Sequence, residues 1–331
     1  MSAKSDKLEA VAEWIFRGKW VVKKNIQQLF DEYMIECEFI QMLRPGTLQS
    51  RRQSFSNLKK IVPDLSIETL TSNNIAQFFK VLRTRNRVIG KGTIVSGVTK
   101  STVAKYWSDY NSFFSWLKTK AIISNNPLSE MKRPSPRFEN RQYLEKMDVG
   151  KIITAILFQS DSDFLKIRNL VIFYILLLCG LRRKELLALE MKDIDFVEKT
   201  LTIRFETSKG NRTRLIPLHP DLITYLKQYL KVRKHYTTPF LIVSSKKDAG
   251  LTNEGLNRLV ATLSKQSKVK FHLHQLRHTF AVNFLKNTNN VAKLQQLLGH
   301  VDVSITVQYL RCLPPSEMQG DIATMSIDNF M

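Results

Sequence analysis

The sequence predicts a mainly α-helical protein of two domains that also contains a small β-hairpin. Apolar residues recur at helical spacing through most of the 331 residues, whereas one region alternates apolar and polar positions as half-buried strands do. A chain of this length usually exceeds what one hydrophobic core serves. Three prolines in residues 125–137 forbid a continuous helix, so we expect this window to link the two domains. Residues 1–22 are expected to form an extension ahead of the first domain.

The N-terminal domain, residues 23–124, is expected to be a bundle of four helices. The helical patterns run over residues 26–42, 48–62, 73–82 and 101–117. Pro45 and Gly46 separate the first two helices, and Ser101 or Thr102 is expected to cap the fourth.

A basic segment, residues 83–100, has no helical period, and we expect a mobile loop there. Positive side chains and accessible glycine amides suit DNA phosphates, and a merely solvated connection is the alternative. The candidate DNA-binding residues of this loop and of the linker are Arg83, Arg85, Arg87, Lys91, Lys100, Lys132 and Arg133.

The C-terminal domain, residues 138–331 with a tail from residue 312, is expected to combine helices with one hairpin. Residues 164–179 are apolar almost all round and predict a buried helix that ends at Gly180. Alternation at residues 200–205, a polar turn and a second strand at 213–218 predict the hairpin. Further helices are expected at about 222–232, 253–264, 274–286, 291–298 and 303–310.

The charge of the chain favours a polyanionic partner. It carries 51 Lys and Arg against 29 Asp and Glu, a formal net charge of +22. Residues 1–140 and residues 141–331 each carry a net charge of +11, so the excess is not confined to a tail. This spread is typical of a protein that grips nucleic acid between two domains, and a generally basic surface is the alternative.

The cysteines and the lengths of the apolar runs indicate the cellular compartment of the protein. Cys37, Cys179 and Cys312 lie far apart without a CxxC pair, so we expect neither a disulfide framework nor a thiolate zinc site. The longest apolar run is too short to cross a bilayer, and no secretion signal opens the chain. We therefore expect a soluble protein of the reducing cytoplasm.

Two basic positions stand where a side chain can be held against an anion. Arg182 follows the buried helix at once, its fork of donors suits two oxygens of one phosphate, and Glu185 could orient it from three residues on. Lys209 lies in the turn of the hairpin, where a flexible lysine can reach a ligand. Taken alone, a surface arginine pair and a solvated lysine are the alternatives.

A denser group lies at residues 272–278. On a helix, His274, Arg277 and His278 share one face that could grip an anion. A zinc site at His274 and His278 is not expected, because neither a glutamate base nor an acidic or cysteine third ligand lies nearby. His300 follows a helix that ends at glycine, and a short helix then carries Tyr309, which alone would be read as packing.

Five motifs together resemble the tyrosine recombinase family of phage integrases, Xer and Cre. They are GLRRKELL, SKGNRTRLIPL, HLHQLRHTFA, LLGH and the tyrosine nine residues after that histidine, and they occur in the family's order over residues 135–311. The resemblance implies a C-shaped DNA clamp, with an N-terminal helical (SAM-like) core-binding domain and a C-terminal α+β catalytic domain.

The resemblance also implies the chemistry. Tyr309 would be the nucleophile that forms a 3′-phosphotyrosine and leaves a free 5′-hydroxyl. Arg182 and Arg277 would stabilise charge on the phosphate, and Lys209 would protonate the departing 5′-oxygen. His274 would accept the tyrosine proton or orient the phosphate, and His300 would add a hydrogen bond to the phosphate. Glu185 would position Arg182, and His278 would support the site.

No metal or cofactor is implied, because arginines would do the work of a cation. The expected partners are double-stranded DNA with specific recombination sites and three further copies of the chain, at the nucleoid. Apolar residues Ile322, Met325, Ile327 and Phe330 of the tail are expected to dock on a neighbouring protomer, with docking on the same protomer as the alternative.

Three alternatives stay open at this point. A type IB topoisomerase or telomere resolvase would use a similar residue set, and a catalytically silent DNA-binding protein would keep only the fold. Arg183 could exchange roles with Arg182, which directly precedes it. Ser208 departs from the glycine that many relatives carry before the lysine, and we expect it to alter the flexibility of the turn rather than the chemistry.

Overall fold

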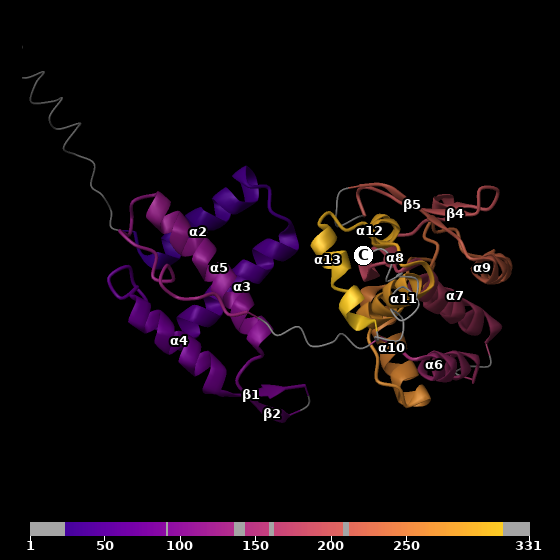
Figure 1. Cartoon of the computed structure of the whole chain (residues 1–331), viewed down its shortest axis with the longest axis horizontal. Coiled ribbons are helices and arrows are strands. Elements are labelled where there is room, and N and C mark those ends of the chain that lie inside the picture. The colour runs from indigo at the N-terminus through magenta and orange to yellow at the C-terminus, as the bar shows by residue number, and fades with distance from the viewer. Residues whose placement is uncertain (1–23, 91, 136–142, 159–161, 208–211, 314–331) are drawn as a thin grey trace, which may run out of the picture. The chain divides into compact units, whose positions relative to one another are not determined.

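The computed structural model describes residues 24–90, 92–135, 143–158, 162–207 and 212–313. The chain divides into two compact units between residues 138 and 139. Both are mainly helical with small sheets (Figure 1). The sequence predicted the helical character of both units and the hairpin of the C-terminal one, but no sheet in the N-terminal one. The predicted N-terminal extension and most of the predicted tail lie outside the described residues. Within the described ranges, no helix is long and apolar enough to cross a membrane.

The N-terminal unit contains the four predicted helical segments. They are α2 (Ile26–Ile35), which continues into the π-helical turn η1 (Glu36–Ile40), α3 (Pro45–Ile61), α4 (Ser72–Thr84) and α5 (Lys100–Thr119). The predicted cap of α5 was wrong by two residues or more, because Thr99 Oγ1 accepts the hydrogen bond of the Thr102 backbone N–H at 3.3 Å. Pro45 does not precede α3 but opens it, at the position where a missing N–H costs no helical hydrogen bond.

Aromatic side chains dominate the core of this unit. Phe30 of α2 stacks on Phe55 of α3 with ring centroids 3.8 Å apart, and Phe113 of α5 meets both rings edge-on. Edge-to-face and offset-stacked rings are the favourable arrangements of such pairs. These ring contacts hold α2, α3 and α5 together, although the three helices lie far apart in the sequence.

The predicted basic loop at residues 83–100 was wrong, because an antiparallel hairpin forms there. Its strands are β1 (Asn86–Ile89) and β2 (Thr93–Ser96), in which Val88 pairs with Ile94. β-branched residues on both sides of a glycine-containing turn favour strands. This preference decided the local structure, although the basic composition had suggested a loop. Val88 and Ile94 remain exposed.

The C-terminal unit combines a three-stranded antiparallel sheet with a larger set of helices. Its helices are α6 (Lys146–Phe158), α7 (Asp163–Cys179), α8 (Arg183–Leu187), α9 (Pro220–Arg233), α10 (Asn253–Ser267), α11 (Leu273–Thr288), α12 (Val291–Leu298) and α13 (Val303–Val307), with 3-10 turns η2 (Met191–Asp193) and η3 (Leu310–Cys312). The strands, in sheet order, are β3 (Ile194–Asp195), β4 (Thr200–Ile203) and β5 (Arg214–Pro217). The predicted hairpin is β4 and β5, while β3, α6 and α8 had not been predicted.

Helix α7 is the buried helix that the sequence predicted, and it positions the site. It packs against α9 and α11, and it ends at Gly180 with φ +61° (Figure 1). A Cβ at Gly180 would lie 2.3 Å from Phe280 Cδ1 of α11, so the missing side chain lets the two helices approach. Arg182 and Arg277 are brought together at this junction.

Candidate active site

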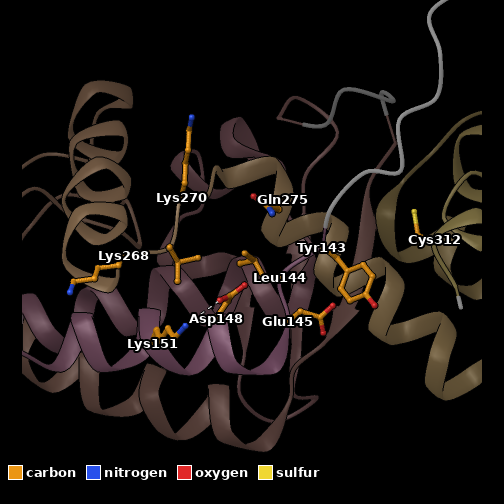
Figure 2. A pocket seen from close by; sticks show the side chains of 10 residues that line it. Tyr143, Leu144, Glu145, Asp148, Lys151, Lys268, Lys270, Gln275 and Cys312 are labelled. Carbon is orange, nitrogen blue, oxygen red and sulfur yellow. Dashed lines mark ion pairs between the residues drawn. The ribbon is translucent and has the colours of Figure 1, made fainter.

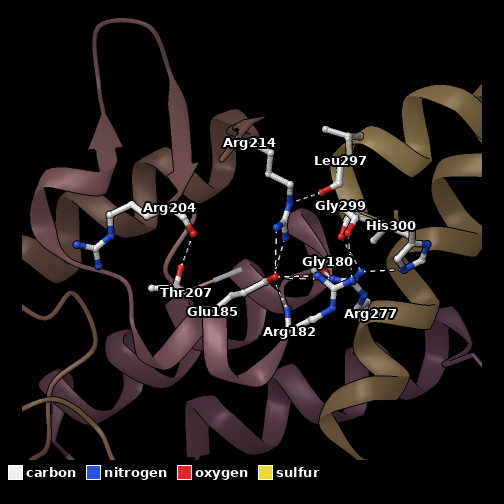
Figure 3. Close-up of polar contacts among 11 residues, drawn as sticks. Gly180, Arg182, Glu185, Arg204, Thr207, Arg214, Arg277, Leu297, Gly299 and His300 are labelled. Atoms are coloured by element: carbon white, nitrogen blue, oxygen red, sulfur yellow. Dashed lines mark hydrogen bonds and ion pairs between the residues drawn. The ribbon is translucent and has the colours of Figure 1, made fainter. Parts of the chain in front are cut away.

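A buried carboxylate lies at the centre of the site. Glu185, on α8, is 1% exposed. Its two oxygens accept hydrogen bonds from Arg182 Nη1 at 2.9 Å, from the Arg182 backbone N–H at 2.9 Å and from Arg214 Nη2 at 2.7 Å (Figure 3). Burial raises the pKa of Glu185, but the hydrogen bonds and charges of Arg214 and Arg182 outweigh it and leave the pKa below its ordinary value. Glu185 is therefore an ionised anchor for the arginines around it.

Arg182 is the arginine of the site that solvent can reach. It occupies the N-cap position of α8, its Nη2 donates to the Gly299 carbonyl at 3.3 Å, and its side chain is 22% exposed. Arg183, by contrast, is exposed, and these hydrogen bonds to Glu185 and Gly299 come from Arg182. The Gly-Leu-Arg assignment of Arg182, rather than Arg183, agrees with this geometry.

Arg277 is held almost without freedom. It is 1% exposed, and its guanidinium donates to the Gly180 carbonyl at 2.7 Å and to the Leu298 carbonyl at 2.8 Å. Burial, and next the charge of Arg182, lowers the pKa of Arg277 to about 10, so the group is still charged at neutral pH. The result is a preorganised cation whose direction is fixed by backbone carbonyls.

The tautomer of His300 follows from its partners. Arg277 Nη2 lies 3.0 Å from His300 Nε2, and since arginine has donors only, Nε2 must accept. Nδ1 then carries the proton and donates to Thr306 Oγ1 at 2.8 Å. Burial and the charge of Arg277 lower the pKa of His300 to about 3, which agrees with a neutral ring.

A chain of aromatic rings leads from the surface to Tyr309. His274 is exposed on the first turn of α11, and its ring centroid lies 4.4 Å from the ring centroid of His278. The His278 ring centroid in turn lies 5.2 Å from the ring centroid of Tyr309. The His300 ring is nearly parallel to Tyr309 at 6.3 Å. Tyr309 is 2% exposed and lies within an apolar cluster that includes Phe280, so in this structure it is a buried side chain.

Arg214 belongs to this cluster and was missed in the sequence. It begins β5, is 8% exposed, and holds both oxygens of Glu185, with Nη1 at 3.2 Å and Nη2 at 2.7 Å. A signal for it does exist, because Arg214 and Ile216 share the buried side of a strand whose alternate residues, Leu215 and Pro217, are exposed. A charged residue on the apolar side of a strand indicates a buried partner.

The candidate DNA-binding residues lie on different parts of the N-terminal unit. Arg83 and Lys132 line one hollow of about 460 Å³ between α4, α5 and the following segment, together with Lys80 and Trp107. The other described candidates do not line it: Arg85 ends α4, Arg87 Nε donates to the Gly97 carbonyl at 2.7 Å, Lys100 begins α5 and Arg133 is exposed. Lys91 and the catalytic candidate Lys209 lie outside the described residues.

Another hollow, of about 560 Å³, lies elsewhere on the C-terminal unit (Figure 2). Its lining mixes cations with carboxylates, including Lys151, Lys270 and Asp148, and it contains none of the predicted catalytic residues. A smaller one, of about 290 Å³, does border the cluster at Arg214 and His300. In the part of the chain that the structure describes, no three His, Cys, Asp or Glu side chains are grouped to hold a metal ion.

Comparisons with known proteins agree on the family. Residues 142–314 match the model of the phage integrase family. Tyrosine recombinase XerC of Alcanivorax borkumensis is 26% identical over 296 residues, which cover 86% of this chain and 89% of the relative. The crystal structure of XerH bound to palindromic difH, a post-cleavage complex, superposes with a TM-score of 0.70 at 18% identity, over 89% of this chain and 83% of that one.

A λ integrase tetramer bound to a Holliday junction has a similar fold, with a TM-score of 0.67 at 17% identity, over 93% of this chain and 86% of that one. The family model alone spans more than half of the chain, and it includes every residue of the cluster around Glu185. The chain therefore belongs to the phage integrase family and is a tyrosine recombinase, an enzyme that cuts and rejoins DNA at specific sites.

Proposed function

We propose that Tyr309 is the nucleophile and that Arg182, Lys209, His274, Arg277 and His300 complete the catalytic set. The Tyr309 oxygen attacks the scissile phosphorus and gives its proton to His274, while the bond from phosphorus to the 5′-oxygen breaks and that oxygen takes a proton from Lys209. The product is a 3′-phosphotyrosine with a free 5′-hydroxyl. Attack by the 5′-hydroxyl of a partner strand reverses these transfers and completes strand exchange.

The observation that carries this proposal is that Arg182 and Arg277 both pair with the buried Glu185 carboxylate, at 2.9 Å and 3.9 Å. His300 contacts Arg277, and its ring lies beside Tyr309. Arg277 is fixed by two backbone carbonyls, and Arg182 is the cation that a phosphate can reach. Donors held in place before the reaction stabilise charge that develops in the transition state without reorganising. Since His300 Nε2 accepts from Arg277, we assign His300 the role of helping the Gly180 and Leu298 carbonyls to orient Arg277.

We propose that residues 23–124 form the core-binding domain, residues 125–137 the linker and residues 138–331 the catalytic domain, which together close on the duplex as a clamp. Between Glu68 and Asp109 the sequence has seven basic residues and no acidic one. This tract, which includes α4, the β1–β2 hairpin and the start of α5, suits the phosphate backbone. The proposed DNA contacts of this tract are Arg83, Arg85, Arg87, Lys91 and Lys100, and those of the linker are Lys132 and Arg133.

We further propose that four protomers act on two specific sites in the cytoplasm, at the nucleoid, and that the tail of each docks on its neighbour. The λ integrase structure on a Holliday junction is a tetramer, which supports this stoichiometry. Deleting residues 315–331 should abolish cooperative assembly on DNA in a gel shift. Unchanged complexes would contradict docking on a neighbour.

The nucleophile is tested by trapping it on DNA. Wild-type protein incubated with fragmented DNA of its source genome and quenched in detergent should leave covalent adducts, and sequencing their ends gives the site for a nicked suicide substrate. The free end should accept a kinase label without phosphatase treatment, as a 5′-hydroxyl does. Tyr309→Phe should give no adduct, while the control Tyr236→Phe, which alters a ring stacked on Phe164, should behave as wild type.

Two results would refute the assignment: no adduct from the wild type, or an undiminished adduct from Tyr309→Phe. Supercoiled plasmid that lacks the mapped site separates the enzyme classes. A recombinase should leave it supercoiled, whereas rapid relaxation would indicate topoisomerase activity.

A further inference from the structure

We propose that Arg214 is a positioning residue of the reaction, which fixes Glu185 and, through it, the phosphate-binding guanidinium of Arg182. The inference rests on the proposed function, because it assigns a purpose to a residue that lies behind the catalytic set. Arg214 itself is 8% exposed, so it acts through its neighbours and not on DNA.

Arg214 uses every nitrogen of its guanidinium. Nη1 and Nη2 form a fork on the two oxygens of Glu185, at 3.2 Å and 2.7 Å, and Nε donates to the Leu297 carbonyl at 2.8 Å (Figure 3). A planar fork on a carboxylate sets the orientation of both groups. The Glu185 carboxylate is therefore locked in one plane from the side of β5.

Arg182 depends on that plane. Its Nη1 and its backbone N–H bind different oxygens of Glu185, so rotation of the carboxylate would break at least one of these hydrogen bonds. A buried carboxylate also needs paired charges to remain ionised. Without Arg214, Glu185 would lose the cation that does most to keep its pKa low, and Arg182 would lose a fixed counter-charge.

The C-terminal end of α12 binds Arg214 side by side with the two proposed catalytic arginines, Arg182 and Arg277. Three consecutive carbonyls there each accept a hydrogen bond from an arginine of a different element. The pairs are Leu297 O with Arg214 Nε at 2.8 Å, Leu298 O with Arg277 Nη2 at 2.8 Å, and Gly299 O with Arg182 Nη2 at 3.3 Å. The last carbonyls of a helix have no partner within the helix and lie at the negative end of its dipole, so they attract cations.

Gly299 makes this arrangement fit. It ends α12 with φ +63°, and a Cβ there would lie 3.1 Å from Arg214 Nη1 and 3.2 Å from its Cδ. Because His300 follows directly, Arg214 braces the backbone that presents both the Gly299 carbonyl and the His300 ring. Arg214 thus joins β5, α8 and the α12 end into one rigid support for Arg182.

The test uses Arg214→Gln and Arg214→Lys in single-turnover cleavage of the suicide substrate. A catalytic group displaced by about 1 Å loses on the order of 100-fold in rate, so we expect Arg214→Gln to cleave about 10- to 100-fold more slowly. Arg214→Lys, which keeps the charge but not the fork, should recover part of the loss. Affinity for DNA should stay within about twofold, because the residue is buried.

Modified phosphates show through which group Arg214 acts. A methylphosphonate at the scissile position carries no negative charge and demands less of Arg182, so the defect of Arg214→Gln should shrink at least fivefold on it. A 5′-bridging phosphorothiolate has a leaving group that needs no acid, and it should leave the defect unchanged. Arg204→Gln is the matched control. Arg204 directly follows β4 of the same hairpin but pairs with Glu190, so this variant should keep the wild-type ratio of rates between the substrates.

Wild-type ratios in both Arg214 variants would overturn the inference, as would rescue by the phosphorothiolate, which would place the effect at the leaving group. If Arg214→Gln does not fold, the ratio measured with Arg214→Lys decides alone. Failure of the proposed function is distinguishable, because the wild type itself would then form no adduct.

Discussion

Replacing Gly180 by alanine should damage the junction between α7 and α11. The residue has φ +61°, a conformation that costs an L-residue about 1–2 kcal/mol. The new Cβ would lie 2.3 Å from Phe280 Cδ1, and overpacking of this kind costs about 1–3 kcal/mol. We therefore expect Gly180→Ala to lower the free energy of unfolding of the C-terminal unit by about 2–5 kcal/mol.

The distribution of tryptophans allows this effect to be located. The four tryptophans, Trp14, Trp20, Trp107 and Trp116, all precede residue 138. In urea denaturation of the full chain, the fluorescence transition therefore reports the N-terminal unit, while far-UV circular dichroism reports both. Gly180→Ala should shift the circular dichroism transition to lower urea and leave the fluorescence midpoint in place.

Gly150→Ala is the matched control within the same unit. Gly150 lies inside α6 with nothing within 4 Å of an added Cβ, so alanine should stabilise by about 0.5–1 kcal/mol. Gly180→Ala should also slow suicide-substrate cleavage, because the Gly180 carbonyl accepts the Arg277 hydrogen bond and Phe280 lies in the apolar cluster of Tyr309. Stability within about 0.5 kcal/mol of the wild type, together with full activity, would refute this account of the junction.

Three further outcomes are expected. Thr306→Val removes the acceptor of the His300 Nδ1 proton and should slow single-turnover cleavage about tenfold, a loss of about 1.4 kcal/mol. Thr306→Ser keeps the acceptor and should retain the wild-type rate. A wild-type rate in Thr306→Val would contradict the assigned tautomer. The pKa of His300 is about 3 in the folded state against 6.5 ordinarily, so the unfolded state binds an extra proton below pH 6.5 and the free energy of unfolding should fall as the pH drops from about 6.5 towards 5. Urea denaturation followed by circular dichroism at several pH values measures this slope. His300→Gln should flatten it, and an unchanged slope would argue against a buried neutral ring. Arg83→Ala should weaken DNA binding regardless of sequence and reduce the slope of log K against log salt by about 0.9, whereas an unaltered slope would remove Arg83 from the phosphate contacts.

Local patterns in the sequence determined most of the helices, the β4–β5 hairpin and the membership of the family. The apolar stretch before Gly180 predicted α7 and its end, because burial on all sides and a left-handed cap leave a direct trace in residue type. The hairpin at residues 86–96 was missed, since short strands with exposed apolar residues have no clear period. The order and spacing of five motifs predicted a tyrosine recombinase, and the comparisons confirmed it.

Only the tertiary structure decided how the site is held together. Arg214 lies 29 positions from Glu185 and 83 from Leu297 in the chain, and no local pattern records that one guanidinium binds both. The burial of Tyr309 likewise depends on packing against α11 and α12. Sequence patterns report each residue's own surroundings along the chain, whereas hydrogen bonds between distant elements arise only when the core brings their backbones together. The sequence therefore determined which residues are candidates for the chemistry, and the fold decided which of them share one carboxylate and one helix end.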